Sequence, residues 1–296
     1  MLSLHTNAAS LSAQAVSSFT NKALTTSMTR LSTGFRVNSA MDDAAGLQIA
    51  TRLDAQTRGM AVAMRNTQNG ISMMQTAEGA MNEVTNILLR MKDMATEAAT
   101  ASTSQDDRTA LQGEYNALGK ELANIMKNTS FGGAKLFSDG TVVDGTGGLL
   151  DSTTLTFQIG ASDGEKMEVD TKTDLGSLAA ALQSISTDYA SGTTGTELGT
   201  TDTTAANGML STLETAINAV GTFRSSLGAA SNRLDHVYNN LSNMSQNSQA
   251  ARGRIMDVDY ASESANMTTK QMLMQASTSM LKQSNSMSQL ALSLLQ

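Results

Sequence analysis

The sequence predicts a mainly α protein: an elongated antiparallel coiled-coil or helical-bundle rod with a small β-hairpin region and with terminal helices that pair. Two long stretches carry apolar residues at every seventh position, the repeat of helices that pack side by side. The chain has 296 residues and no proline, where average usage of about 5% would give roughly 15. Because proline breaks helices, its absence suits long ones. Aromatic residues make up 3% of the chain, too few for one thick globular core.

Two long helices are expected, over residues 45–101 and 205–255. In the first, two rows repeat every seven residues, namely Leu53, Met60, Thr67, Met74, Met81, Leu88 and Ala95, and Ala63, Gly70, Ala77, Val84, Met91 and Ala98. In the second, the row is Leu213, Val220, Leu227, Leu234, Leu241, Ser248 and Ile255. At 1.5 Å per residue the helices would measure roughly 80 and 75 Å. Matching lengths favour an antiparallel pair over two unrelated amphipathic helices.

A shorter helix and an acidic excursion are expected between them, which completes a rod domain over residues 45–255. The short helix covers 105–127 and begins with a capping box of Ser104 and Asp107. A hairpin and an excursion follow over 138–204, with two strands around an Asp163-Gly164 turn. Residues 144–202 hold ten acids and two lysines, a net charge of −8, so the rest of the chain carries +1 of the total −7. The middle therefore faces water.

The two ends of the chain, residues 1–44 and 256–296, are expected to form helices that need a partner. They contain few charged residues and many weak helix formers, so neither helix stabilises itself. Because the long helices are antiparallel, both ends emerge together and can pair. Their apolar stripes predict a terminal or inter-subunit seam that consists of Leu4, Leu11, Phe19, Leu31, Leu273, Met280, Met287, Leu290 and Leu294.

The stretch TRLSTGFRVNSAMDDAAGLQIATRL, residues 29–53, is predicted to join the N-terminal helix to the rod. The first helix breaks at Gly34, and an extended linker that includes Arg36 follows. Ser39 is expected to cap the long helix, with Asp42 and Asp43 in its first turn complementing the helix dipole. A catalytic carboxylate pair is disfavoured, because adjacent residues on a helix point about 100° apart.

No catalytic, cofactor or metal site is predicted, and the chain is not expected to be an enzyme. His5 and His236 lack metal-ligand spacing, and the phosphate-binding and nucleophile-elbow glycine motifs are absent. The absence of cysteine excludes disulfides and thiolate chemistry. The charge distribution disfavours nucleic acid as a partner. The N-terminus lacks a secretory signal, and no run of 18 apolar residues exists. We therefore expect no membrane insertion, and either a cytoplasmic location or export by another route.

Two stretches carry a resemblance to a known family. LSTGFRVNSAMDDAAGLQIATRL, with RNTQNGISMMQTAEGAMNEVTNILLRMKDMA, resembles the N-terminal signature of bacterial flagellins. LGAASNRLDHVYNNLSNMSQNSQAARGRIMDVDYASESANMTTKQMLMQASTSMLKQSNSMSQLALSLL is similar to their C-terminal signature. The chain departs from larger flagellins in the loop around 188–204, where those insert one or two outer domains. It looks like a near-minimal flagellin.

This resemblance implies a structural subunit of the flagellar filament, which serves motility and lies outside the cell. Such a subunit is exported unfolded through the flagellar type III apparatus and polymerises with copies of itself under a filament cap. Its terminal helices pair into a coiled coil on assembly. The implied partners further include an export chaperone at the C-terminal segment and the hook–filament junction proteins.

The resemblance also implies recognition by innate immune receptors. Arg90, Met94 and Glu114 stand where flagellins contact animal Toll-like receptor 5, with Met94 in place of the usual leucine. Residues 29–50, with Arg30, Arg36 and Asp43, resemble the peptide sensed by a plant flagellin receptor. For Arg90 and Glu114 the alternative is solvated helix surface that packs against other subunits. For the whole chain, two alternatives stay open: a secreted coiled-coil needle-tip or adhesin protein, and a hydrolase that uses Asp42, Asp43 or His236.

Overall fold

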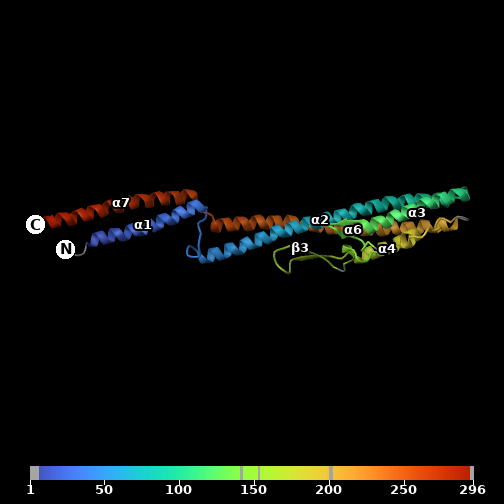
Figure 1. Ribbon diagram of the computed structural model, residues 1–296, viewed down its shortest axis with the longest axis horizontal. Helices are drawn as coiled ribbons and strands as arrows, with labels where there is room; N and C mark the ends of the chain where they lie inside the picture. Colours follow the sequence, from blue (N-terminus) through green and yellow to red (C-terminus); the bar gives the residue numbers. More distant parts are fainter. Residues whose placement is uncertain (1–6, 141–142, 153, 200–202, 294–296) are drawn as a thin grey trace. The chain divides into compact units, whose positions relative to one another are not determined.

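A computed structural model describes residues 7–140, 143–152, 154–199 and 203–293, with side chains described up to residue 287. The chain divides into two compact units, residues 58–245 and residues 1–57 with 246–296. In chain order the elements are α1 (Ala8–Thr33), α2 (Ala44–Ala98), α3 (Gln105–Asn128), β1 (Ser130–Phe131), β2 (Ala134–Lys135), the 3-10 helix η1 (Leu149–Asp151), β3 (Leu155–Gln158), β4 (Lys166–Val169), α4 (Lys172–Ile185), α5 (Thr187–Ser191), α6 (Thr204–Met256) and α7 (Tyr260–Ser293) (Figure 1).

The core of the unit formed by residues 58–245 contains the apolar rows of α2 and α6. On α2, the residues of both predicted rows from Met60 to Ala98 are buried. On α6, the predicted row is buried from Leu213 to Leu241, while Ser248 and Ile255, in the other unit, are only partly covered. The seven-residue repeat is confirmed for this unit. The buried Thr67 hydroxyl donates to the Ala63 carbonyl at 2.8 Å, so it does not interrupt the helix.

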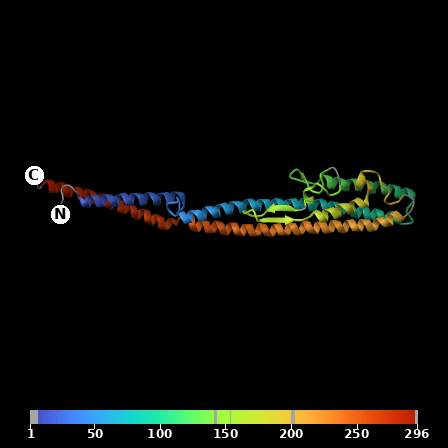
Figure 2. The same cartoon turned by 90° about the horizontal axis from the view of Figure 1, so that it is seen from below.

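Contacts between α2 and α6 confirm the antiparallel pairing within this unit (Figure 2). Met60 and Ala63 cluster with Leu241, Gly70 faces Leu234, and Glu78 forms a 3.7 Å ion pair with Arg224. Residue numbers therefore rise along α2 as they fall along α6. Gly70 is required for a close approach, since a Cβ there would lie 2.9 Å from the Phe157 ring and 3.1 Å from Leu234.

The smaller predicted elements of this unit are also present. The capping box at Ser104 and Asp107 starts α3, and the Tyr115 hydroxyl of α3 donates to the Ile185 carbonyl at 2.8 Å. The predicted hairpin is β3 paired antiparallel with β4, in a register that places Leu155 opposite Val169.

The sequence did not indicate α5, which begins at a Ser186 cap directly after α4. The loop after α5 is held to α3 by Gln112, whose amide donates to Glu197 at 2.7 Å and whose side-chain oxygen accepts from the Leu198 amide at 2.7 Å.

The predicted break at Gly34 is confirmed, but the predicted cap of α2 is wrong. Gly34 ends α1 in the left-handed conformation, with φ of 76°. Helix α2 begins at Ala44, and the Asp43 carboxylate accepts the Gly46 amide at 2.8 Å, so Asp43 is the cap instead of Ser39. Ser39 and Asp42 instead form a turn before the helix, in which the Asp42 carboxylate accepts the Ser39 amide at 3.0 Å. Neither acid therefore lies in the first helical turn.

Within the described part of the chain, no helix is both long and apolar enough to cross a membrane.

Candidate functional site

The unit formed by residues 1–57 and 246–296 contains an antiparallel pair of helices, α1 and α7, which lie side by side (Figures 1 and 2). Near one end of the pair, the Asn7 side-chain amide donates to the Ser284 hydroxyl at 3.1 Å. Further along, the Ser277 hydroxyl donates to the Ala13 carbonyl at 3.0 Å. At the other end, Arg30 lies 3.8 Å from Glu263. The two helices therefore run in opposite directions along their whole described length.

Small residues occupy most of the buried positions of this helix pair, and Leu24, Leu31, Met274 and Leu281 beside them are partly covered. On α1 the facing row is Ala13, Thr20 and Ser27, spaced seven apart, of which Thr20 and Ser27 are buried. On α7 it is Ser277 and Ser284. Small side chains let two helix backbones approach closely but bury little apolar area, and no large apolar side chain in the described part of the pair is fully buried, so the contact contributes limited hydrophobic stabilisation. The seven-residue spacing of Thr20 and Ser27 was the sequence signal for this helix contact. A search for helix contacts that considers only apolar residues misses it.

The large apolar side chains predicted to form the seam face away from this contact. Leu11 is 66% exposed, Phe19 71%, Leu273 47%, Met280 66% and Met287 54%, while Leu31 is partly covered. On α7, Leu273, Met280 and Met287 form a row beside the one that holds Ser277 and Ser284. Leu4 and Leu294 lie outside the described residues, as does the Leu290 side chain. The structure thus does not bring the described seam residues together within one chain.

Exposed apolar surface is concentrated in this unit. Among the described residues, 15 large apolar side chains are exposed, and all but Val62, Leu89 and Met244 belong to it. By contrast, the buried apolar residues in the described part of this unit are only Val37 and Ala50. Exposed apolar side chains concentrated in one unit are typical of a surface that contacts another macromolecule.

The linker between α1 and α2 is tied to the junction of α6 and α7. The Arg36 amide donates to the Met256 carbonyl at 2.6 Å, and its guanidinium donates to the Ile255 carbonyl at 2.9 Å. The Val258 amide in turn donates to the Gly34 carbonyl at 3.0 Å. A Cβ on Gly34 would lie 2.9 Å from the Tyr260 hydroxyl, so glycine serves both the turn and the close approach. Arg36 therefore binds backbone oxygens of its own chain.

Arg30 is the charged centre of the same junction. Its guanidinium lies 3.9 Å from an Asp42 oxygen in the linker and 3.8 Å from a Glu263 oxygen in α7. Glu263 is only 8% exposed, so its carboxylate depends on this cation. Backbone hydrogen bonds from Asn38 and Ser39 lower the pKa of Asp42, with smaller contributions from the Ser39 hydroxyl and from Arg30. Arg30 thus links α1, the linker and α7 by charge.

In the other unit, Arg90 and Glu114 form an exposed ion pair between α2 and α3. The Arg90 Nη2 and Nε atoms lie 2.7 and 3.0 Å from the same Glu114 oxygen, and both side chains are about half exposed. The hydrogen bond to Glu114 raises the pKa of Arg90.

Met94 was expected beside this pair as a receptor contact, and the structure corrects that expectation. Met94 is 0% exposed and belongs to the core. Helices α3 and α6 both contribute to the same core cluster as α2. Residues of α2 outside the two predicted apolar rows, such as Met94, are therefore buried as well.

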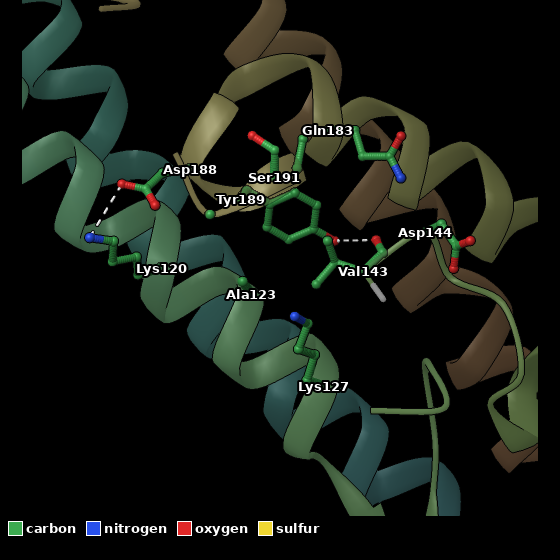
Figure 3. A pocket seen from close by; sticks show the side chains of 11 residues that line it. Lys120, Ala123, Lys127, Val143, Asp144, Gln183, Asp188, Tyr189 and Ser191 are labelled. Atoms are coloured by element: carbon green, nitrogen blue, oxygen red, sulfur yellow. Dashed lines mark hydrogen bonds and ion pairs between the residues drawn. The ribbon is translucent and has the colours of Figure 1, made fainter. Parts of the chain in front are cut away.

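Figure 3 shows a pocket of about 430 Å³ between α3 and the excursion. Asp188, 2% exposed, forms a 3.6 Å ion pair with Lys120 at its rim. The Tyr189 hydroxyl donates to the Val143 carbonyl at 2.9 Å, and burial raises the pKa of Tyr189. These contacts fasten α5 and the segment at Val143 to α3.

The residues considered as catalytic candidates do not lie together in one site. Asp42 and Asp43 each accept local backbone hydrogen bonds. His236 lies in a shallow groove with Arg233 and Lys166, in the other unit, and His5 lies outside the described residues. Within the described ranges, no three His, Cys, Asp or Glu side chains are grouped as metal ligands would be.

Two family models match the chain. One describes the bacterial flagellin N-terminal helical region and matches residues 4–141, and the other describes the bacterial flagellin C-terminal helical region and matches residues 210–295. The acidic middle lies between the two matches.

Individual relatives are similar over nearly the whole length. Flagellin B of Vibrio anguillarum is 36% identical over 373 aligned residues, which cover 99% of each chain. That alignment is longer than this 296-residue chain, so the relative contains stretches that are absent here. The flagellin of Halalkalibacterium halodurans is 40% identical over 269 residues, or 90% of each chain.

A solved structure from Vibrio parahaemolyticus, described as that of a flagellar hook-associated protein, is similar with a TM-score of 0.53. It is 15% identical and covers 73% of this chain and 100% of its own. At this identity the likeness concerns the fold alone.

Proposed function

The chain belongs to the bacterial flagellin family, and from this premise we propose how its two terminal helices contribute to assembly. It is a structural subunit of the flagellar filament, located outside the cell, and its short length fits a near-minimal form of the family. What the terminal helices contact in that filament, and which other proteins bind them, are the subject of the proposal.

We propose that other copies of the chain cover the outward-facing apolar side chains of α1 and α7. The single observation that carries this proposal is the arrangement of the helix pair. The buried residues of the pair are Thr20, Ser27, Glu263 and Ser277, whereas Leu11, Phe19, Leu273, Met280 and Met287 are exposed. A folded monomer gains nothing from exposing such side chains, whereas a polymer buries them at every subunit contact.

The weak intrachain contact of α1 and α7 supports a further part of the proposal, that these segments order on assembly. Helices that bury so little apolar area are marginal in isolation. Before assembly the chain passes unfolded through the flagellar type III apparatus, and an export chaperone holds the C-terminal segment. The filament cap and the hook–filament junction proteins then contact the same surface. A chain whose ends fold only against partners also avoids premature polymerisation.

A truncation tests the subunit contact directly. A chain that lacks residues 257–296 is mixed with filament fragments as seeds, and polymer is followed by electron microscopy. We expect no elongation beyond the seeds, while the full-length chain elongates them. Elongation equal to that of the full-length chain would contradict the proposal. Circular dichroism gives a second readout, since helix content should rise when monomer assembles.

Recognition by innate immune receptors is a second proposed function. The exposed Arg90–Glu114 pair offers a charged surface of the kind that a receptor contacts, and it is accessible in the free chain. We propose that Toll-like receptor 5 binds this surface and that the plant flagellin receptor binds residues 29–50, which include Arg30, Arg36 and Asp43. Receptor signalling by purified monomer tests both proposals, and a response unchanged by Arg90→Ala would contradict the first.

We also propose that the chain acts without catalysis. Asp42 and Asp43 serve a turn and a helix cap, and His236 lies in the other unit from both. A non-flagellar secreted coiled-coil protein, the other alternative, does not account for two flagellin matches at opposite ends of the chain.

A further inference from the structure

Methionine exposure divides sharply between the two units. Among the described residues six methionines are exposed, and all except Met244 belong to the unit with α1 and α7: Met28, Met41, Met272, Met280 and Met287. Eight are buried, and all belong to the other unit: Met60, Met73, Met74, Met81, Met91, Met94, Met126 and Met167. The same residue type therefore fills a core in one unit and covers an open surface in the other.

Exposed thioethers react with two-electron oxidants, whereas buried ones are shielded. The chain has 20 methionines and no cysteine, so thioethers are its only sulfur. No thiol in the chain competes for the oxidant. With a peroxide, the sulfur lone pair attacks one peroxide oxygen and the O–O bond breaks. An S–O bond forms and the sulfur loses two electrons. The proton of the transferred oxygen moves to the other oxygen, which leaves as water.

From this distribution we infer that Met280 and Met287, together with the separate exposed positions Met28 and Met272, are sulfoxidation sites whose modification blocks assembly of the chain. The inference rests on the proposed contact between subunits. Met280 is 66% exposed and Met287 54%, in the same outward row of α7 as Leu273. A sulfoxide is polar, so it opposes burial of that row against another copy. The Met280 and Met287 side chains are exposed and lie outside the α1–α7 contact made by Ser277, so their oxidation acts on contacts between copies and not on that intrachain contact.

The reaction is reversible in principle, which separates it from permanent damage. Methionine sulfoxide reductases return the sulfoxide to the thioether. In assembled filaments the same side chains are covered under the proposed contact, so polymer is protected and free chain is sensitive. These sites therefore make the unassembled chain the oxidant-sensitive form.

The first test maps oxidation on the full-length free chain. Chain treated with hydrogen peroxide is digested, and each methionine is quantified by mass spectrometry. We expect Met28, Met41, Met272, Met280 and Met287 to react at least about tenfold faster than the eight buried methionines, which serve as internal controls. Equal rates in the two groups would overturn the inference. In polymer made from untreated chain, Met280 and Met287 should react at least about tenfold more slowly than in free chain.

The second test connects oxidation to assembly. Oxidised chain is added to filament seeds, and we expect elongation to slow by roughly tenfold for each oxidised methionine that the contact buries. The variant Met28→Leu, Met272→Leu, Met280→Leu, Met287→Leu should elongate seeds both before and after peroxide. Met244→Leu, which removes the exposed methionine of the other unit, is the matched control and should stay sensitive.

The outcomes separate this inference from the proposed function. The inference is overturned if wild-type chain with fully oxidised Met280 and Met287 still elongates seeds. It is also overturned if peroxide slows elongation by the leucine variant as much as it slows elongation by wild type. If the untreated leucine variant fails to elongate seeds, a second experiment replaces it. Oxidised wild-type chain is treated with methionine sulfoxide reductase and added to seeds. If elongation does not return, the inference is overturned. Failure of the proposed function is a different result, namely elongation by the chain that lacks residues 257–296.

Discussion

The Ser277 hydroxyl of α7 donates a 3.0 Å hydrogen bond to the Ala13 carbonyl of α1. This contact places a serine, one helical turn from Leu273 and Met280, against the other helix of the same chain. The apolar row beside it is left exposed. The terminal helices thus leave this apolar row for contacts outside the chain, and the following predictions test this arrangement and the packing of the other unit.

The close approach at Gly70 predicts opposite effects for two glycine substitutions in α2. Gly70→Ala places a methyl group 2.9 Å from the Phe157 ring and should lower the free energy of unfolding by about 1–3 kcal/mol. At Gly79 a new methyl group would meet no described atom within 4 Å, so Gly79→Ala should raise the free energy of unfolding by about 0.5–1 kcal/mol. Urea unfolding measures both, and equal effects would contradict the packing described here.

The junction around Arg30 predicts a weakened terminal unit when the cation is removed. Arg30→Met leaves the mostly buried Glu263 carboxylate without its cation, at a cost of about 1–3 kcal/mol. The melting temperature of assembled filaments should fall. Lys270→Met, also on α7, removes a cation that forms no ion pair with the described residues and should leave the melting temperature nearly unchanged. If filaments of Arg30→Met chains melt at the same temperature as wild-type filaments, the junction depends on backbone contacts alone.

The turn at Asp42 predicts sensitivity to acid. Its pKa is lowered by the Asn38 and Ser39 amides, so the turn is stabilised above the unfolded pKa of about 3.9 and loses this stability as pH falls through the lower, folded value. Protection of the Ser39 amide from hydrogen exchange in the filament should therefore fall in acid. Asp42→Ala should lose that protection at neutral pH, whereas Asp93→Ala, an exposed acid on α2, should not. Full protection in Asp42→Ala would contradict the role of the carboxylate.

The surface pair and the buried methionine near it predict separable effects on stability and recognition. Arg90→Ala removes an exposed pair and should leave the free energy of unfolding nearly unchanged, while receptor signalling falls. Met94→Ala removes a fully buried side chain and should cost about 2–5 kcal/mol. Signalling per folded molecule should survive Met94→Ala, and a large loss there would place Met94 on the recognition surface after all.

The sequence was informative where one physical rule decided the outcome. Seven-residue apolar rows predicted α2 and α6 and their buried faces, because a long helix in a bundle must bury a periodic stripe. The Ser104 capping box and the Asp163-Gly164 hairpin followed from local hydrogen bonding and turn chemistry.

Where several partners compete, the sequence was less informative. Ser39 and Asp43 both suit a helix cap, and only the path of the linker decides for Asp43. Met94 is buried because α3 and α6 contribute to the same cluster around α2, which one helix's periodicity cannot reveal. The buried positions of the α1–α7 contact include Thr20, Ser27 and Ser277, so an apolar pattern does not identify that row.

The most direct test of the central claim is seeded elongation by the variant Leu273→Gln, Met280→Gln, Met287→Gln, followed by electron microscopy. Its matched control is Ser264→Gln, Gln271→Ser, Thr278→Ser, which changes exposed polar positions of the same helix. If copies of the chain bury the outward row, the first variant fails to elongate seeds and the control elongates them like wild type. Elongation by the first variant at the wild-type rate would contradict the claim that this row forms the contact between subunits.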